Sequence, residues 1–300
     1  MSARVASPAA VADLLAAAAL WGGMYVVSAG TFSRIPPLTL GLLRLVVGVA
    51  VLAIAFRLRL GFRRASAPRV VAAGAVVALT LVLQFVGTDL TGGAEGALLT
   101  TTTPAFVLLF GVTLERERVP SIAWVGVALA LAGVAVVAAR SSAAVAASPE
   151  AIVGDLLLVA SAATWALFSS VGRPLVTEVG AFRAILQSST VAIVLLVPLA
   201  AVELARTPIP PLDAPGLAAV AYLGIGATAL AWSLWYRGYA SAPPAVSAAA
   251  FFVQPIVGGA LGALLLHETL DVPFIVGGLL IGAGILALVV PLPGRRAVTG

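Results

Sequence analysis

The segment PIVGGALGALLLHETL, residues 255–270, repeats the pattern of PAFVLLFGVTLERERV, residues 104–119. In each segment a proline opens an apolar run and a glutamate follows thirteen residues later. The two pairs are Pro104 with Glu117 and Pro255 with Glu268. The glutamate recurs, whereas His267, the only histidine of the chain, has Arg116 as its counterpart. The chain is therefore predicted to contain two related halves, and glutamate is the constant residue at this position.

The composition indicates a protein whose surface faces lipid. Of 300 residues, 61% are hydrophobic and 10% are charged, whereas soluble proteins carry about 25% charged residues. The seventeen basic residues are all arginine and lie scattered between apolar runs, which favours membrane topology signals over a nucleic-acid surface. The absence of cysteine excludes disulfides and thiolate chemistry.

Ten segments are long and apolar enough to cross a bilayer, which requires about 20 residues per helix. Turn residues or charges separate them. The predicted spans are 9–29, 37–57, 70–88, 94–114, 121–139, 153–172, 182–202, 215–236, 245–266 and 273–290. The first run is interpreted as a true span, because a cleaved signal peptide has a shorter apolar core.

The arginines predict the direction of the chain. With both termini in the cytoplasm, twelve arginines fall on the inner side and three, Arg34, Arg140 and Arg206, on the outer side. Arg183 at the inner end of the seventh span strengthens this bias, and Arg44 is left inside a span. Because cytoplasmic loops carry an excess of arginine and lysine, the sequence predicts a multi-pass protein of the cytoplasmic membrane with both termini inside.

The spans divide into two halves of five helices, 9–139 and 153–290. Five is an odd number, so the second half must enter the membrane in the opposite direction to the first. The predicted fold is all-α, with ten transmembrane helices in two inverted five-helix repeats. Inverted repeats are the architecture on which secondary transporters build alternating access.

Several of these features together resemble the EamA family of the drug/metabolite transporter superfamily. They are the two five-helix halves, the Leu-Leu-Arg-Leu segment at 42–45, the proline in the fourth helix, and the glutamate before the fifth. The segments 110–119 and 264–270 are similar to the Gly-Glu-Arg-like ending of that family, with Leu-Glu and Leu-His where glycine is usual. The resemblance covers residues 9–290. It implies an inner-membrane permease for small metabolites, often amino acids, with efflux the favoured direction.

Arg44 is the first candidate for substrate binding. It lies about seven residues into the second span, and an intramembrane arginine costs several kcal/mol unless it faces a cavity or a partner. One interpretation is that its side chain reaches the outer surface. The other is a cationic site for the carboxylate of an anionic or zwitterionic solute. Gln187, at the equivalent depth of the seventh span, is the neutral counterpart.

Pro104 and Pro255 are candidate hinges. Each lies near the middle of its span and removes one helical hydrogen bond. The hydroxyls of Thr100–Thr103 precede Pro104 and could either satisfy the freed carbonyls or face a substrate, so Thr103 is a candidate binding residue. Gln254 precedes Pro255 at the same depth and is a second candidate. A passive kink is the alternative for both prolines.

Aromatic and amide side chains inside the spans are further candidates. Trp21, Tyr25 and Trp165 are predicted either to line a cavity or to pack against neighbouring helices. Gln84 is as consistent with a bond to a neighbouring helix as with a substrate contact. Three other aromatic residues near the inner end of the eighth span are expected to belong to the interfacial belt: Trp232, Trp235 and Tyr236.

Glu117 and Glu268 lie at the membrane surfaces, on opposite sides. Anchoring of the following turns is the favoured interpretation, and a gate or a proton site is the alternative. His267 is expected to be a solvated loop residue, because no metal-ligand spacing surrounds it. Asp13 and Asp155 are expected to stabilise the starts of the first and sixth helices.

A membrane-embedded scaffold or signalling protein and an intramembrane enzyme are the alternatives to a transporter. An enzyme would need a paired acid and base or a nucleophile within the bilayer, and the acidic residues lie near helix ends. No metal, cofactor or nucleic acid is expected as a partner, whereas a small-molecule substrate and membrane lipid are. The Gly258-x-x-x-Gly262 and Gly278-x-x-x-Gly282 patterns predict close packing of the last two helices, or a homodimer interface.

Overall fold

The structure is a computed structural model that describes residues 7–57, 65–114, 116, 121–143, 149–242, 246 and 249–289. These residues form helices and connections, with no strand among them. The helices are α1 (Pro8–Ala29), α2 (Pro37–Arg57), α3 (Ala67–Thr91), α4 (Gly93–Leu99), η1 (Thr100–Thr102), α5 (Thr103–Thr113), α6 (Ser121–Ala143), α7 (Pro149–Val179), α8 (Ala181–Arg206), α9 (Ala214–Ala221), η2 (Tyr222–Leu230), α10 (Ala231–Ser241), α12 (Val253–Leu265) and α13 (Val272–Val289).

The predicted all-α membrane fold is confirmed. Seven segments of the described chain are long and apolar enough to cross a membrane, and α4–η1–α5 and α9–η2–α10 each count as one of them. Three shorter apolar helices, within α6, α12 and α13, occupy the remaining predicted spans. Most boundaries agree with the predicted ones, because prolines mark many helix starts. The exceptions are α7, which ends at Val179 where 172 was predicted, and α12, which begins at Val253 where 245 was predicted. The crossing of these three helices, and so the total of ten spans, stays a prediction.

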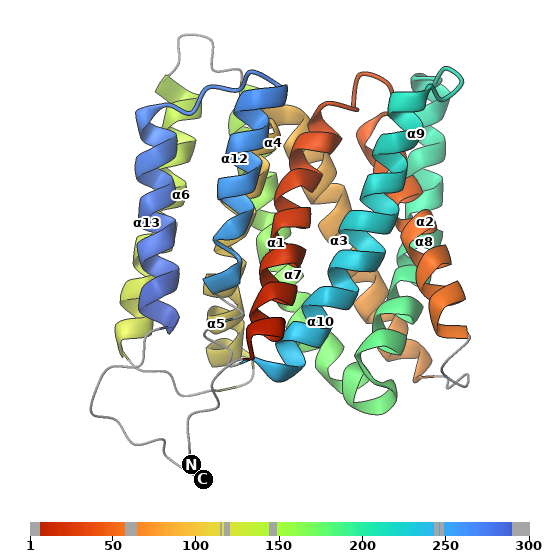
Figure 1. Ribbon diagram of the computed structural model, residues 1–300, viewed down its shortest axis with the longest axis horizontal. Helices are drawn as coiled ribbons and strands as arrows, with labels where there is room; N and C mark the ends of the chain where they lie inside the picture. The colour runs from red at the N-terminus through yellow and green to blue at the C-terminus, as the bar shows by residue number, and fades with distance from the viewer. Residues whose placement is uncertain are drawn as a thin grey trace.

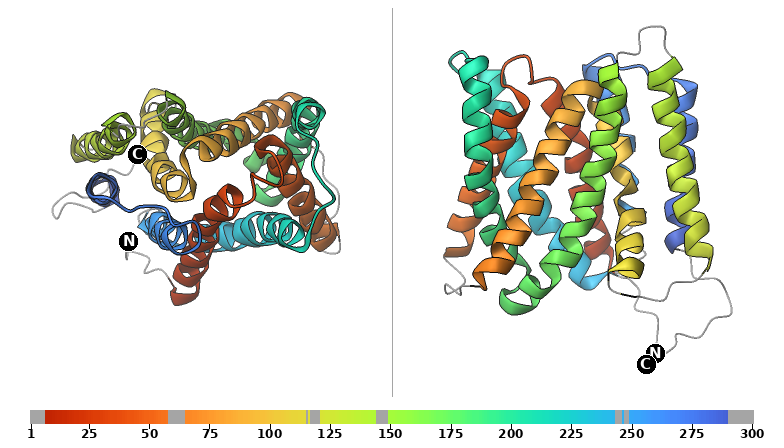
Figure 2. Two further views of the ribbon diagram at one scale, coloured as in Figure 1. Left: turned by 90° about the horizontal axis from the view of Figure 1, so that it is seen from above. Right: turned by 180° about the vertical axis from the view of Figure 1, so that it is seen from behind.

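The helices run up and down in one bundle (Figure 1). Helix α1 begins and α13 ends at the lower end in that view, and the α12–α13 connection lies at the upper end. Helix α3 lies along α7 and α8, and α1 lies against α10 and α12. Helices α6 and α13 stand side by side at one edge of the bundle (Figure 2).

The predicted close packing of the last two helices is wrong. Helix α13 packs along α6, and α12 packs on α1 and α4. A Cβ added to Gly258 would lie 2.3 Å from the Cβ of Ala97 in α4, so this glycine allows a contact between the two halves. A Gly-x-x-x-Gly pattern indicates a close approach but does not name the partner helix.

The expected roles of Asp13 and Asp155 also need correction. The side chain of Ser7 caps α1 by accepting from the N–H of Ala10 at 3.2 Å, and Asp13 instead forms a two-point ion pair with Arg237. Helix α7 begins at Pro149, so Asp155 lies in its second turn, where its side chain is buried.

Glutamates of the second half accept hydrogen bonds from backbone N–H groups at the helix starts of the first half. Glu203 accepts from the backbone N–H groups of Leu38 and Thr39 at the start of α2. Glu178 accepts from the N–H of Ser66, just before α3, at 2.8 Å. These contacts satisfy helix-start donors that have no partner within their own helix.

Asp213 and Arg34 make a further contact between the halves at the upper end. Asp213 caps α9 through Gly216 and pairs with Arg34 at 3.1 Å. The hydrogen bond from the Gly216 N–H, followed by the one from Arg34, lowers the pKa of Asp213 below its ordinary value.

Glu268 is the glutamate whose position recurs as Glu117 in the first half. Its two carboxylate oxygens accept from the N–H groups of Gly93 and Ala94, each at 2.7 Å. They close the sharp break between α3 and α4, where Gly92 adopts a φ of +125°. Glu268 thus anchors the start of α4 in the first half, whereas the expected contact was with the turn that follows it. Glu117 lies outside the described residues, and a gating role for either glutamate stays a proposal.

Replacing Glu268 by alanine is expected to lower the free energy of unfolding by about 1–2 kcal/mol, because two helix-start N–H groups lose a charged acceptor. The midpoint of thermal unfolding in detergent measures the effect. Glu268→Gln keeps one accepting oxygen and should lose less. A Glu268→Ala variant as stable as the parent would contradict the anchoring role.

Candidate functional site

The fourth span is interrupted in its middle by the turn η1. Pro104 has no N–H, so the carbonyl of Thr100, four residues earlier, loses its helical donor. The hydroxyl of Thr103 donates to that carbonyl at 2.8 Å. The hydroxyls of Thr100, Thr101 and Thr102 likewise donate to backbone carbonyls. The threonines therefore repair the break, and Thr100 and Thr103 also line the cavity described below.

A second irregularity lies in the eighth span, where η2 is a π-helix of nine residues. Such widened turns are rare and often occur at functional sites. Here the carbonyl of Ala227 accepts from the indole N–H of Trp21 at 3.0 Å. The hydroxyl of Thr228 donates to the carbonyl of Leu223, five residues earlier, at 2.8 Å. The π-helix thus gives both α1 and α2 a polar partner inside the bundle.

In α2 the residue that bonds to the π-helix is Arg44. Its Nε–H donates to the hydroxyl of Thr228 at 2.8 Å, and its Nη1 donates to Oε1 of Gln84 at 3.2 Å. Gln84 in turn donates to the hydroxyl of Tyr25 at 2.7 Å. The close approach of α2 to η2 requires a glycine, because a Cβ on Gly48 would lie 2.5 Å from the Cγ2 of Thr228.

The guanidinium of Arg44 is buried without an anion. Its side chain is 3% exposed, so it does not reach the outer surface. Within the described part of the chain it has no carboxylate within ion-pair distance, and Nη2 has no hydrogen-bond partner. The ring of Phe85 lies 5.8 Å from its Cζ atom. A buried cation held only by neutral groups is expected to attract an anion.

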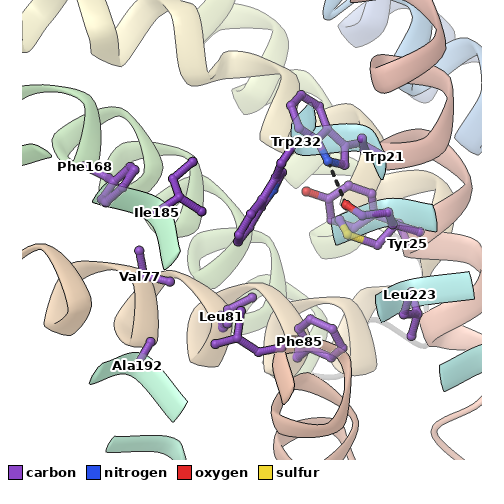
Figure 3. Packing of buried hydrophobic residues seen from close by; sticks show 14 of the residues in the cluster. Trp21, Tyr25, Val77, Leu81, Phe85, Phe168, Ile185, Ala192, Leu223 and Trp232 are labelled. Atoms are coloured by element: carbon purple, nitrogen blue, oxygen red, sulfur yellow. Dashed lines mark hydrogen bonds between the residues drawn. The ribbon is translucent and has the colours of Figure 1, made fainter. Parts of the chain in front are cut away.

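Aromatic side chains gather next to this polar network. The rings of Trp165 and Trp232 are stacked with centroids 6.3 Å apart, and those of Trp21 and Phe251 are stacked at 6.1 Å. Figure 3 shows Trp232 between Trp21 on one side and Phe168 with Ile185 on the other. The rings come from α1, α7, α10 and the segment before α12, and so from both halves of the chain.

The polar network and the aromatic rings line one cavity. Its polar lining is Tyr25, Arg44, Thr80, Gln84, Thr100, Thr103, Ser161 and Gln254, and its apolar lining is Trp21, Met24, Val77, Leu81, Ala162, Trp165, Trp232 and Phe251. The cavity volume open to the centres of water molecules is about 50 Å³. One water needs roughly 10–15 Å³ on this measure, so the present conformation has room for a few waters or one compact solute.

Seven of the eight side chains singled out from sequence as binding candidates line this cavity. The seven are Trp21, Tyr25, Arg44, Gln84, Thr103, Trp165 and Gln254. Gln187 lies elsewhere, because its Oε1 accepts from the N–H of Ala65 at 3.2 Å near the start of α3. Pro104 and Pro255 directly follow two of the lining residues, Thr103 and Gln254.

Two important residues escaped the sequence analysis. Trp232 was assigned to the interfacial belt, but it is 5% exposed and lines the cavity. Thr228 had no distinguishing signal, because YLGIGATAL (222–230) has the apolar composition of an ordinary transmembrane helix. In the described residues, no group of three or more His, Asp or Glu side chains could hold a metal ion.

Comparison with known proteins agrees with this architecture. The model of the EamA-like transporter family matches residues 9–139 and 152–290. The chain belongs to the EamA-like transporter family. It is therefore a multi-pass membrane protein of a transporter family and not an enzyme.

Several related proteins match along most of their length. An uncharacterized transporter of Bacillus subtilis, YetK, is 27% identical over 94% of this chain and 87% of its own. The uncharacterized inner membrane transporter YedA of Escherichia coli is 26% identical over 84% and 81%. The uncharacterized protein PA1977 of Pseudomonas aeruginosa is 30% identical over 86% of each chain. A solved crystal structure shares the fold with a TM-score of 0.67, at 22% identity over 93% of this chain and 94% of that one.

Thr228→Val is expected to lower the free energy of unfolding by about 1–3 kcal/mol, because the variant leaves the buried Nε–H of Arg44 without an acceptor. Thr228→Ser keeps the hydroxyl and should cost less than half as much. Thermal unfolding of both variants in the same detergent measures the difference. Equal stability of the valine and serine variants would contradict the role assigned to this hydroxyl.

Proposed function

We propose that this EamA-like protein is a secondary transporter that moves a small metabolite across the cytoplasmic membrane by alternating access. The solute is zwitterionic or anionic, an amino acid or a related compound, and export is the favoured direction. The observation that carries the proposal is Arg44, a cation buried against a cavity without a carboxylate partner in the described residues. A guanidinium matches a carboxylate with two parallel hydrogen bonds.

The position of the cavity supports alternating access. Its lining comes from both halves, and transporters with inverted repeats place their substrate sites between the repeats, near broken helices. Here the fourth span is broken at η1 and the eighth contains the π-helix η2. Few backbone hydrogen bonds need to change when a helix bends at such a place. The contacts of Arg34, Glu203 and Glu178 with the opposite half are then candidates for rearrangement during transport.

The arginine distribution supports an orientation with both termini in the cytoplasm. The chain lacks cysteine, so single cysteines can report it. Thr177→Cys at the lower end should react with an impermeant maleimide only after the cells are opened. Thr207→Cys at the upper end should react in intact cells. The reverse pattern would place the termini outside.

Arg44→Ala is expected to lower the rate of amino acid counterflow into proteoliposomes about 10- to 150-fold. The expected factor corresponds to about 1.5–3 kcal/mol, the contribution of hydrogen bonds to a charged group. The assay uses a mixture of labelled amino acids and short carboxylic acids on both sides of the membrane, and thermal unfolding confirms that the variant is folded.

Arg206→Ala is the matched control, because Arg206 is exposed at the end of α8 and is not one of the cavity-lining residues. It should transport at the parental rate. A folded Arg44→Ala variant that also transports at the parental rate would overturn the assignment of the anion site. Absence of saturable flux in the parent would overturn the transporter itself.

A further inference from the structure

The residue before each mid-helix proline behaves differently in the two halves. Thr103 precedes Pro104, Gln254 precedes Pro255, and both side chains line the cavity. Each proline removes the donor that the carbonyl four residues earlier would have in a regular helix. In both helices the backbone N–H of the residue before the proline replaces that donor, and only the side chains of these two residues differ.

In the first half the backbone N–H of Thr103 donates to the carbonyl of Thr100, and the side chain adds a second bond. The hydroxyl of Thr103 donates to the carbonyl of Thr100 at 2.8 Å. In the second half the carbonyl in question belongs to Phe251, and it accepts from the backbone N–H of Gln254 at 3.0 Å. The main chain therefore closes this turn without help from the glutamine side chain.

The amide of Gln254 has no partner in the described protein. The residue is 4% exposed, and its Oε1 is buried without a hydrogen bond. Its Nε2 makes no hydrogen bond with the described residues either. An unpaired buried amide costs about 1–3 kcal/mol, a cost expected where a ligand completes the bonding. The last torsion of a glutamine is a broad twofold rotor, so either end of the amide can turn toward a bound solute.

The other residues of the cavity lining indicate which end of the Gln254 amide, the oxygen or the NH₂ group, would bond to a solute. Its described lining contains one cation, Arg44, and no Asp or Glu. A solute bound through a carboxylate at Arg44 therefore finds no ion-pair partner for an ammonium group. The lining offers several hydroxyl oxygens and aromatic rings, and among its acceptors the buried Oε1 of Gln254 makes no hydrogen bond within the described residues. The rings of Trp21 and Phe251, stacked at 6.1 Å, belong to the same lining. Amide oxygens accept N–H donors, and aromatic faces attract cations.

We propose that Gln254 recognises the amino group of the transported solute, and that the substrate class is amino acids with a free ammonium group. This inference rests on the proposed function and narrows its substrate from anionic or zwitterionic solutes to zwitterions. Arg44 binds the carboxylate, and Oε1 of Gln254 accepts a hydrogen bond from the ammonium group. Gln254 thus determines specificity at the second end of the solute.

The test compares sets of three probes that share one side chain. The full chain in detergent is first screened against the twenty common amino acids by thermal unfolding. The responding amino acid is then titrated beside its desamino acid, which lacks the amino group, and its decarboxylated amine. In the parent, the amino acid is expected to bind about tenfold or more tightly than the desamino acid, the effect of one hydrogen bond to a charged group.

Gln254→Met preserves the size of the side chain and removes the amide. It is expected to weaken binding of the amino acid about tenfold and to leave the desamino acid unchanged, so that the preference disappears. Arg44→Ala should weaken both. Gln187→Met is the matched control, because this amide lies outside the cavity lining and bonds Ala65. It should retain the preference of the parent.

A Gln254→Met variant that keeps the parental preference overturns the inference. So does a parent that binds the desamino acid as tightly as the amino acid, a result that requires no variant to fold. Binding and flux of carboxylic acids, with none for amino acids, would contradict the recognition of an amino group by Gln254. That result would still agree with the proposed transporter. Absence of binding and flux for both classes would contradict both proposals.

Discussion

The burial of one guanidinium constrains the interior of this protein. Arg44 is held inside a lipid-embedded bundle by neutral groups alone, chiefly the Thr228 hydroxyl at 2.8 Å and Gln84 at 3.2 Å. Removing a charge from water costs several kcal/mol unless other groups replace the hydration. The π-helix η2 presents the Thr228 hydroxyl, and Gly48 allows α2 to approach it closely. The π-helix η2 thus supplies the hydrogen-bond acceptor that lets the charged guanidinium of Arg44 be buried.

Two kinds of backbone irregularity meet at the cavity. The break at Pro104 and the turn before Pro255 place Thr103 and Gln254 on its wall, and η2 provides polar partners for Trp21 and Arg44. Irregular backbone within a membrane is tolerated where it is buried in protein or lines a cavity. The backbone carbonyls of Thr100 and Leu223 accept hydrogen bonds from threonine hydroxyls within the protein. In the cavity lining, the Nη2 of Arg44 and the amide of Gln254 have no hydrogen-bond partner among the described residues.

The fold could be predicted from sequence because lipid imposes a simple rule on length and polarity. Apolar runs bounded by proline and arginine predicted most helix limits, although not the end of α7 or the start of α12. For the same reason Arg44, Gln84 and Gln254 stood out as polar residues within apolar spans. The position of Gln187 could not be predicted, because depth in the membrane does not fix the rotation of a helix about its axis. Trp232 and Thr228 were missed because their burial depends on the path of the eighth span through η2.

The central claim is that the carboxylate of a solute binds the guanidinium of Arg44. It can be tested by solid-state NMR on the protein in lipid, with ¹⁵N-labelled arginine and amino acids labelled with ¹³C at the carboxyl group. The account predicts a ¹³C–¹⁵N dipolar contact at about 4 Å, the separation set by a bidentate pair, and its loss in Arg44→Lys. Saturable binding of the labelled amino acids without such a contact would contradict it.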